Sequence, residues 1–258
     1  MTTNLNREFP ILEFDPDGEA LIEPSRILDQ MDVPERCVIC FFQEVIAGLD
    51  EAGALTKLKE LKSEMGSHWL SEIGGYDQRV AIYHPGVGAP LAAGYLDEVI
   101  ALGCRKFIAI GSCGVLDSRI APTTLIVPTA AVRDEGTSYH YLPPAREVEP
   151  DASLTAKLVE TLKRREPRFI RGKTWTTDGF YRETRSKIEL RRAEGCVSVE
   201  MEAAAFMATA RFRGVPFAQL LYASDDLGGA TWDPRRETSR RDVRRLMFDL
   251  AVETLTRS

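Results

Sequence analysis

Short apolar runs alternate with segments of helical periodicity along most of the chain. The runs that suit buried strands are 37–42, 80–83, 107–110, 125–127, 169–175, 197–200 and 217–223. Apolar residues recur every three to four positions in 89–102, 151–165, 202–213 and 237–256, which predicts amphipathic helices there. This alternation predicts an α/β fold of three α/β/α layers, with a central mixed, mostly parallel sheet between helices on both faces.

The length of 258 residues fits one α/β domain, so we expect residues 1–258 to form a single domain. Residues 1–34 lack periodicity and carry scattered acidic residues and prolines. They are expected to form an irregular N-terminal arm over the surface. No internal repeat or low-complexity linker interrupts the rest of the chain.

Composition and charge favour a small-molecule substrate over nucleic acid. No segment approaches the roughly 18 apolar residues of a membrane span, and the first residues lack the features of a secretory signal, so a cytoplasmic protein without a membrane partner is expected. The net charge of −6 argues against nucleic-acid binding. Cys37 and Cys40 have no matching Cys or His pair, so we expect buried thiols and neither a metal nor an organic cofactor.

Four predicted strand ends carry residues able to do chemistry. In a parallel α/β sheet, ligands bind beyond the carboxyl ends of the strands. The four segments are 84–88, 111–114, 200–202 and 224–226. Gly86 and Gly88 either face an anion with their amides or simply form a tight turn. The Gly111-Ser112-Cys113-Gly114 turn adds a hydroxyl that suits a phosphate or sugar oxygen.

The strand end Glu200-Met201-Glu202 places two carboxylates in an apolar context. Such groups need partners, because burying an unpaired charge costs several kcal/mol. A cis-diol such as that of ribose offers two adjacent donors. A negative charge beneath the sugar also stabilises the oxocarbenium-like cation that forms when the C1′–N bond breaks. The alternative is that Glu202 only caps the following helix.

Ser224-Asp225-Asp226 ends the last strand with two adjacent carboxylic acids. Burial and like charge both raise a carboxyl pKa, which favours a proton donor for a leaving base. The alternative is a solvated acidic turn that leads into Gly228 and Gly229.

Together these segments resemble the nucleoside phosphorylase family, which includes uridine phosphorylases, purine nucleoside phosphorylases and methylthioadenosine nucleosidases. The resemblance covers residues 80–255 and is strongest in 199–205, which looks like the ribose-binding strand of that family. The supporting motifs, in order, are 86–88, 110–114, 177–181 and 224–226.

The resemblance implies a role for each matching residue. Glu200, Met201 and Glu202 belong to the ribose site, Phe180 stacks on the base, and Cys113 and Gly114 lie near the base. Asp225 matches the acid that protonates a purine, and Arg240 matches an arginine that assists this acid. That match favours purines over uridine. The implied assembly is a homo-oligomer.

The sequence departs from the family pattern at the positions that bind phosphate. The resemblance implies arginines after the first strand, before the Ile110-Gly111-Ser112 turn and from a neighbouring subunit, yet Ala109 and the segments 41–44 and 66–75 provide none. Each charge-assisted contact is worth roughly 1.5–3 kcal/mol, so phosphate binding is weakened. Ser112 remains as a phosphate ligand, and Arg182 and Arg185 are candidate replacements for the missing cations.

The predicted activity is phosphorolysis of a purine nucleoside or uridine, with inorganic phosphate as co-substrate. Two alternatives stay open: a nucleosidase that uses water, and a nucleoside-binding protein without catalytic activity.

Overall fold

The computed structural model describes residues 7–64, 66–165 and 168–257. The strands are β1 (Arg36–Cys40), β2 (Leu55–Ser63), β3 (Gly66–Ile73), β4 (Val80–Tyr83), β5 (Lys106–Val115), β6 (Leu125–Asp134), β7 (Glu147–Val148), β8 (Phe169–Thr177), β9 (Cys196–Glu200) and β10 (Phe217–Asp226). The α-helices are α1 (Pro24–Ile27), α2 (Gln43–Glu51), α3 (Ala89–Leu102), α4 (Ala152–Arg165), α5 (Arg185–Ala193), α6 (Ala203–Phe212) and α7 (Arg241–Thr256). Three short 3-10 helices are η1 (Pro10–Leu12), η2 (Thr137–His140) and η3 (Phe180–Arg182).

The strands form one mixed sheet, as predicted, and half of it closes on itself. Strand β10 pairs in parallel with β5 and in antiparallel with β6. Strand β6 pairs in parallel with β8, β8 with β9, and β9 returns in antiparallel to β5. These five strands therefore form a ring, from which the order β1, β4, β3, β2 extends beyond β5. The ring brings residues from distant parts of the chain together.

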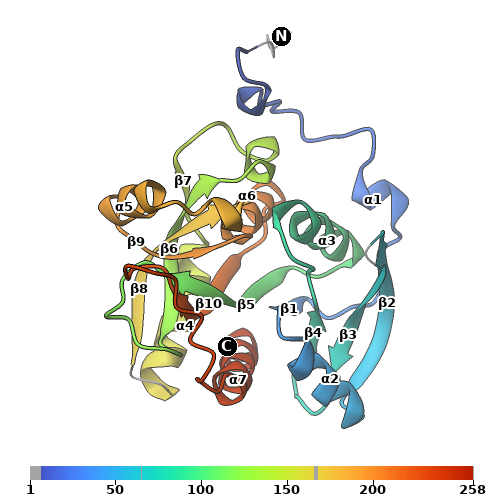
Figure 1. The fold of residues 1–258 in the computed structure, drawn as a ribbon. Coiled ribbons are helices and arrows are strands. Elements are labelled where there is room, and N and C mark those ends of the chain that lie inside the picture. Colours follow the sequence, from blue (N-terminus) through green and yellow to red (C-terminus); the bar gives the residue numbers. More distant parts are fainter. Residues whose placement is uncertain (1–6, 65, 166–167, 258) are drawn as a thin grey trace.

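Helices cover both faces of the sheet, which gives the three predicted layers (Figure 1). Alternate strand residues point to opposite faces. On one face, Val38, Ile108 and Leu220 belong to a core that also contains residues of α2, α4 and α7. On the other face, Ile39, Phe107 and Phe217 belong to a core that also contains residues of α3 and α6. The parallel part of the sheet is thus buried on both sides, as its continuous apolar runs predict.

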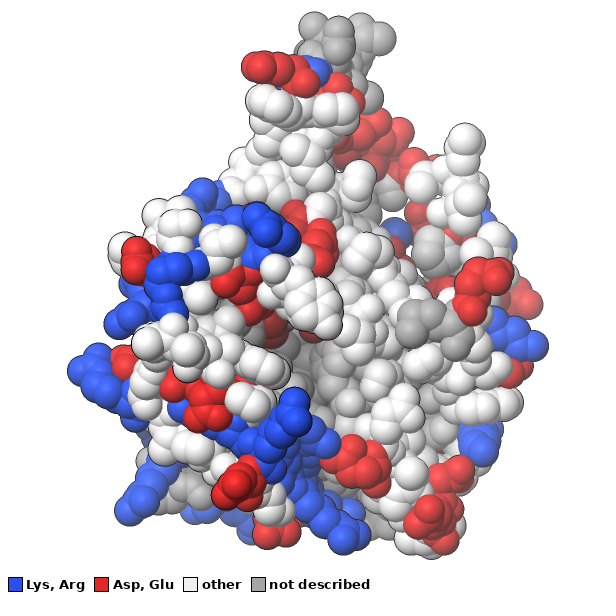
Figure 2. Space-filling model, in the orientation of Figure 1, with Lys and Arg blue, Asp and Glu red and all other residues white. Residues whose placement is uncertain are grey.

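Residues 7–34 contain only η1 and α1 as regular structure, and the first part of this segment extends away from the sheet and its helices (Figure 1). All five cysteines are buried thiols, as predicted for Cys37 and Cys40. Within the described residues, no helix combines the length and apolar character needed to cross a membrane. Figure 2 shows Lys and Arg interspersed with Asp and Glu around the edge of one face, whose hollowed middle is mostly uncharged.

Candidate active site

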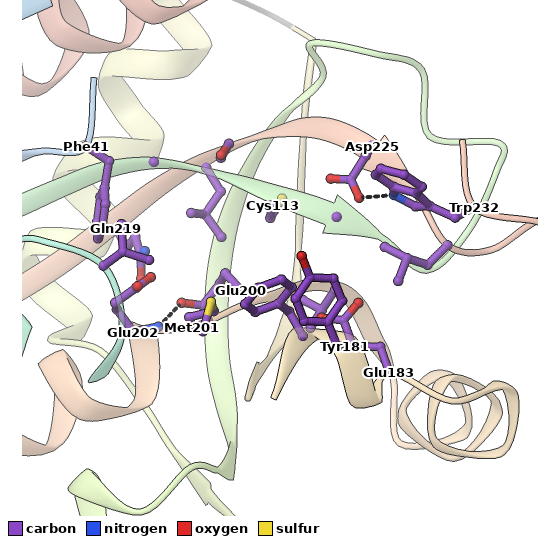
Figure 3. A pocket seen from close by; sticks show the side chains of 18 residues that line it. Phe41, Cys113, Tyr181, Glu183, Glu200, Met201, Glu202, Gln219, Asp225 and Trp232 are labelled. Atoms are coloured by element: carbon purple, nitrogen blue, oxygen red, sulfur yellow. Dashed lines mark hydrogen bonds between the residues drawn. The ribbon is translucent and has the colours of Figure 1, made fainter. Parts of the chain in front are cut away.

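A cavity of about 690 Å³ opens where β5, β9 and β10 meet. This volume is typical of sites for small organic ligands. Its lining combines aromatic rings, small residues and four carboxyl groups (Figure 3). The lining residues are Phe41, Val87, Gly111, Ser112, Cys113, Gly114, Phe180, Tyr181, Glu183, Val199, Glu200, Met201, Glu202, Gln219, Leu221, Asp225, Leu227 and Trp232.

Gly114 allows the three strands to approach each other closely. A Cβ atom added at Gly114 would lie 3.2 Å from a methyl group of Val199, 3.4 Å from the Asp225 carboxylate and only 2.4 Å from Leu227. Any larger side chain would therefore displace the neighbours that form the wall. The strand ends 111–114, 200–202 and 225, expected to share one site, do line one cavity.

Glu200 holds the start of helix α6. One carboxylate oxygen accepts hydrogen bonds from the backbone N–H groups of Glu202 (2.8 Å) and Ala203 (2.6 Å). The other accepts one from the Thr176 hydroxyl at 2.7 Å. Burial nevertheless raises the pKa of Glu200 to about 7. The helix-capping role that we considered for Glu202 thus belongs to Glu200, whose two oxygens both have partners within the chain.

Glu202 is buried and has a different environment. One oxygen of its carboxyl group accepts a hydrogen bond from the backbone N–H of Gly88 at 2.6 Å. Gly88 has a φ of 93° and Gly86 one of 76°, a left-handed conformation that favours glycine, so this turn needs both residues. The backbone N–H of Gly88 binds Glu202 and not a separate anion. Burial, with a smaller contribution from the charge of Glu200, raises the pKa of Glu202 to about 8. The cavity wall thus contains a buried carboxyl group whose ionisation is unfavourable.

Asp225 and Glu183 lie near each other at the far end of the cavity from Glu202 (Figure 3). The indole N–H of Trp232 donates a hydrogen bond of 2.8 Å to the Asp225 carboxylate. Burial, followed by the charge of Asp225, raises the pKa of Glu183 to about 7. Glu183 therefore readily exchanges a proton near neutral pH, beside a second carboxyl group.

Asp226, which we considered as the second acid beside Asp225, has a structural role instead. Its carboxylate accepts a hydrogen bond from the Gly228 N–H at 2.7 Å and contacts Arg235 at 3.4 Å. Successive strand residues point to opposite sides, which separates it from Asp225. The neighbouring acid comes from the segment after Phe180, which sequence spacing alone did not connect with Asp225.

The predicted neutral contacts all reach the cavity, whereas the predicted arginines do not line it. Ser112, Cys113, Gly114, Met201 and Phe180 are in its lining, with Phe180 half-exposed at the surface. The predicted arginines point to solvent or bind backbone carbonyl groups. Arg182 is exposed, the Arg185 guanidinium donates to the carbonyl oxygen of Ala230, and Arg240 donates to those of Ser224 and Pro234. Arg240 thus contacts the backbone next to Asp225.

Sequence reasoning missed several residues of the lining, among them Phe41, Gln219, Glu183 and Trp232. Gln219 carried a usable signal, because it is the one polar residue before Tyr222 in an otherwise apolar strand. Glu183 follows the expected stacking residue Phe180 by three positions. Trp232 lies in a loop beyond β10, and nothing in its local sequence points to the cavity.

The three-layer fold, the cavity and its converging carboxyl groups agree with the nucleoside phosphorylase family that the sequence resembles. Residues 35–255 match the family model of the phosphorylase superfamily, and the chain belongs to that superfamily.

Named relatives cover several activities within this superfamily. A guanosine phosphorylase from Halorubrum lacusprofundi is 27% identical over 172 residues, 64% of this chain and 71% of the relative. A uridine phosphorylase from Salmonella typhimurium is 27% identical over 67% of this chain and 71% of its own length. A DeoD-type purine nucleoside phosphorylase from Colwellia psychrerythraea is 27% identical over 80% of this chain and 86% of its own.

Solved structures confirm the fold. An AMP nucleosidase from Bacteroides thetaiotaomicron superposes with a TM-score of 0.71 at 21% identity, covering 87% of this chain and 88% of that one. A uridine phosphorylase from Vibrio fischeri gives a TM-score of 0.73 at 22% identity, covering 87% and 92%. The family match and the named relatives together make the chain an enzyme of the phosphorylase superfamily.

Proposed function

We propose that this enzyme cleaves the N-glycosidic bond of a nucleoside with water as the attacking nucleophile. One observation carries the choice of water over phosphate: among the described residues, the cavity lining contains four carboxyl groups and no Lys, Arg or His. A phosphate dianion entering this cavity would lose its hydration without the charge-assisted contacts that normally compensate. Water is neutral and does not need a cation.

The proposed roles follow from the positions of the side chains. Glu202, held by the Gly88 N–H, binds the ribose hydroxyls together with Met201, and in its ionised form it stabilises the sugar cation. Phe180 and Tyr181, whose ring centroids are 4.1 Å apart, offer flat apolar surface for the base. Asp225, held by Trp232, donates a proton to the departing base.

Phosphorolysis is the second candidate, because the named relatives include guanosine, uridine and purine nucleoside phosphorylases. In this chain it would require cations from outside the described lining, since Arg182 and Arg185 point to other partners or to solvent. The resemblance to these enzymes favoured phosphate, but the charge of the cavity favours water.

The two reactions are separated by one assay on the unmodified protein. Inosine, adenosine, guanosine and uridine are incubated with and without inorganic phosphate, and free base, ribose and ribose 1-phosphate are measured. We expect the rate of base release to change less than twofold on adding phosphate, and the sugar product to be ribose. Ribose 1-phosphate formed only with phosphate would establish phosphorolysis, and no cleavage of any nucleoside would favour a binding protein.

A 5′-phosphate provides an independent check of the same charge argument. The cavity lining carries no cation among the described residues, so adenosine 5′-monophosphate is expected to be cleaved at least about tenfold less efficiently than adenosine. Comparable kcat/KM values for the two would contradict this reading of the cavity.

A further inference from the structure

Gln219 lies at the end of the cavity opposite Asp225, beside Phe41 and Glu202 (Figure 3). Strand β10 supplies both Gln219 and Asp225, and Leu221 between them also lines the cavity. A ligand lying along β10 would therefore meet the two groups at opposite ends.

The side chain of Gln219 is 2% exposed, and its Oε1 atom has no hydrogen-bond partner among the described residues. An unpaired buried carbonyl oxygen costs about 1–3 kcal/mol. Nearly all buried polar groups in native proteins are paired, and an exception calls for an explanation such as a ligand or an ordered water molecule. This oxygen thus has the properties of a group whose partner arrives with the substrates.

The neighbours of Gln219 on β5 are small residues. Its neighbour across the parallel pairing with β5 is Ala109, and Gly111 follows two positions later on the same face. The Phe41 ring closes this end, because a Cβ atom at Gly111 would lie 3.2 Å from it. The family resemblance implies a phosphate-binding arginine at position 109. This chain has Ala109 there, beside the neutral carboxamide of Gln219.

This end of the cavity offers one carboxamide and one carboxyl group and, among the residues that the structure describes, no cation. It therefore suits a small neutral molecule that donates hydrogen bonds. Water fits this description, since a buried water typically has two to four polar partners. A phosphate ion does not, because the described lining of the cavity has no Lys, Arg or His to balance its charge.

We propose that Gln219 binds the attacking water, with Oε1 accepting one of its hydrogens and Glu202 receiving its other proton. This inference rests on the proposed hydrolysis. The water oxygen forms a bond to C1′ as the C1′–N bond breaks, and the electron pair of that bond goes to the base, which takes a proton from Asp225. One water hydrogen stays on the new hydroxyl group. Glu202 then returns its proton to solvent, and solvent reprotonates Asp225.

The elevated pKa of Glu202, about 8, agrees with this role. Its carboxylate is a stronger proton acceptor than an ordinary glutamate, because burial disfavours the charged form. The ionisable groups that face Glu202 are Glu200 and, more weakly, Asp178.

The test compares Gln219→Met with the wild type, using the nucleoside that the wild type cleaves best among inosine, adenosine, guanosine and uridine. Methionine keeps the volume but removes the acceptor oxygen. We expect kcat to fall about 100-fold, the typical loss for a removed catalytic hydrogen bond, with KM within threefold. Thr155→Val is the matched control, because the Thr155 hydroxyl is likewise buried without a partner but lies outside this cavity. It should keep kcat within twofold.

A second variant keeps the test decisive if Gln219→Met folds poorly. In buffer containing methanol, Gln219→Ala enlarges the water pocket, so the ratio of methyl riboside to ribose should rise several-fold over the wild type. This ratio does not depend on the amount of folded enzyme.

The outcomes separate the two proposals. If the wild type releases base without phosphate but Gln219→Met keeps kcat within threefold, or if Gln219→Ala leaves the product ratio unchanged, the role of Gln219 is wrong while hydrolysis stands. If the wild type itself requires phosphate, both the proposed hydrolysis and the water site are wrong, and the wild-type assay alone reveals it.

Discussion

Replacing Glu202 by glutamine is expected to lower kcat/KM for the nucleoside by about 10²- to 10⁴-fold. It should also stabilise the protein, by an amount that grows as the pH rises from about 4.5 to about 8. The loss of activity follows from the loss of two charge-assisted hydrogen bonds to ribose, each worth roughly 1.5–3 kcal/mol. Glutamine retains an oxygen for the Gly88 N–H, so the wall of the cavity keeps its shape.

The gain in stability follows from the sign of the pKa shift. Burial raises the pKa of Glu202 to about 8, far above the value near 4.5 of an unperturbed glutamate. The folded state therefore holds this proton more tightly than the unfolded state. The stability contributed by the protonated group is complete below about pH 4.5 and is lost as the pH rises to about 8. Glutamine cannot ionise, so the variant escapes this loss.

Thermal unfolding between pH 4.5 and 9 measures the effect. Wild type and Glu202→Gln should unfold at similar temperatures at pH 4.5 and diverge as the pH rises, with a difference on the order of 5 kcal/mol at pH 9. The low-pH comparison serves as the internal control for packing changes. Equal stabilities at pH 9, or a variant that retains activity, would show that Glu202 is not an ionised group held in place for the substrate.

How far the sequence predicts this fold depends on how local each signal is. Helix α3 occupies the predicted residues 89–102, because its apolar periodicity is regular and glycines flank both ends. The β2–β3 hairpin was not predicted. It buries few side chains, among them Leu61 and Leu70. Its many lysines and glutamates do not alternate with apolar residues as in a half-buried strand.

Helices α2 and α5 were missed for a related reason. Helix α2 buries mainly Val45 and Leu49, and α5 buries Ile188 and Arg191, so each carries too short an apolar stripe to stand out. The closure of the ring by β9 against β5 was beyond the sequence pattern as well, since no local feature specifies which distant strands pair.

The residues of the candidate site could likewise be predicted only where the signal is local. Ser112, Glu202 and Asp225, which belong to contiguous motifs, line one cavity. Gln219 and Glu183 reach it only because the ring and the loop after β8 bring them there. The arginines were chosen by position near a motif. Surface arginines have long flexible side chains that find backbone carbonyls and solvent, so spacing alone did not determine where they point.

The role of Asp225 leads to the second large effect. Asp225→Asn is expected to lower kcat for a purine nucleoside by about 10²- to 10⁴-fold, because asparagine can donate a hydrogen bond but cannot transfer a proton to the leaving base. Its side-chain oxygen can still accept the bond from Trp232, so the geometry is preserved. The same variant should cleave 4-nitrophenyl β-ribofuranoside within about tenfold of the wild type, because nitrophenolate leaves without protonation.

Two controls identify the proton donor. Asp226→Asn removes the adjacent carboxylate, which binds Gly228 and Arg235, so it should lower stability and affect both substrates alike. Glu183→Gln removes the acid beside Asp225, whose pKa of about 7 makes it a competing donor. If Glu183→Gln slows only the nucleoside while Asp225→Asn slows both substrates equally, Glu183 is the donor. The proton then comes from the loop after Phe180, while Asp225 raises the pKa of that donor through its charge.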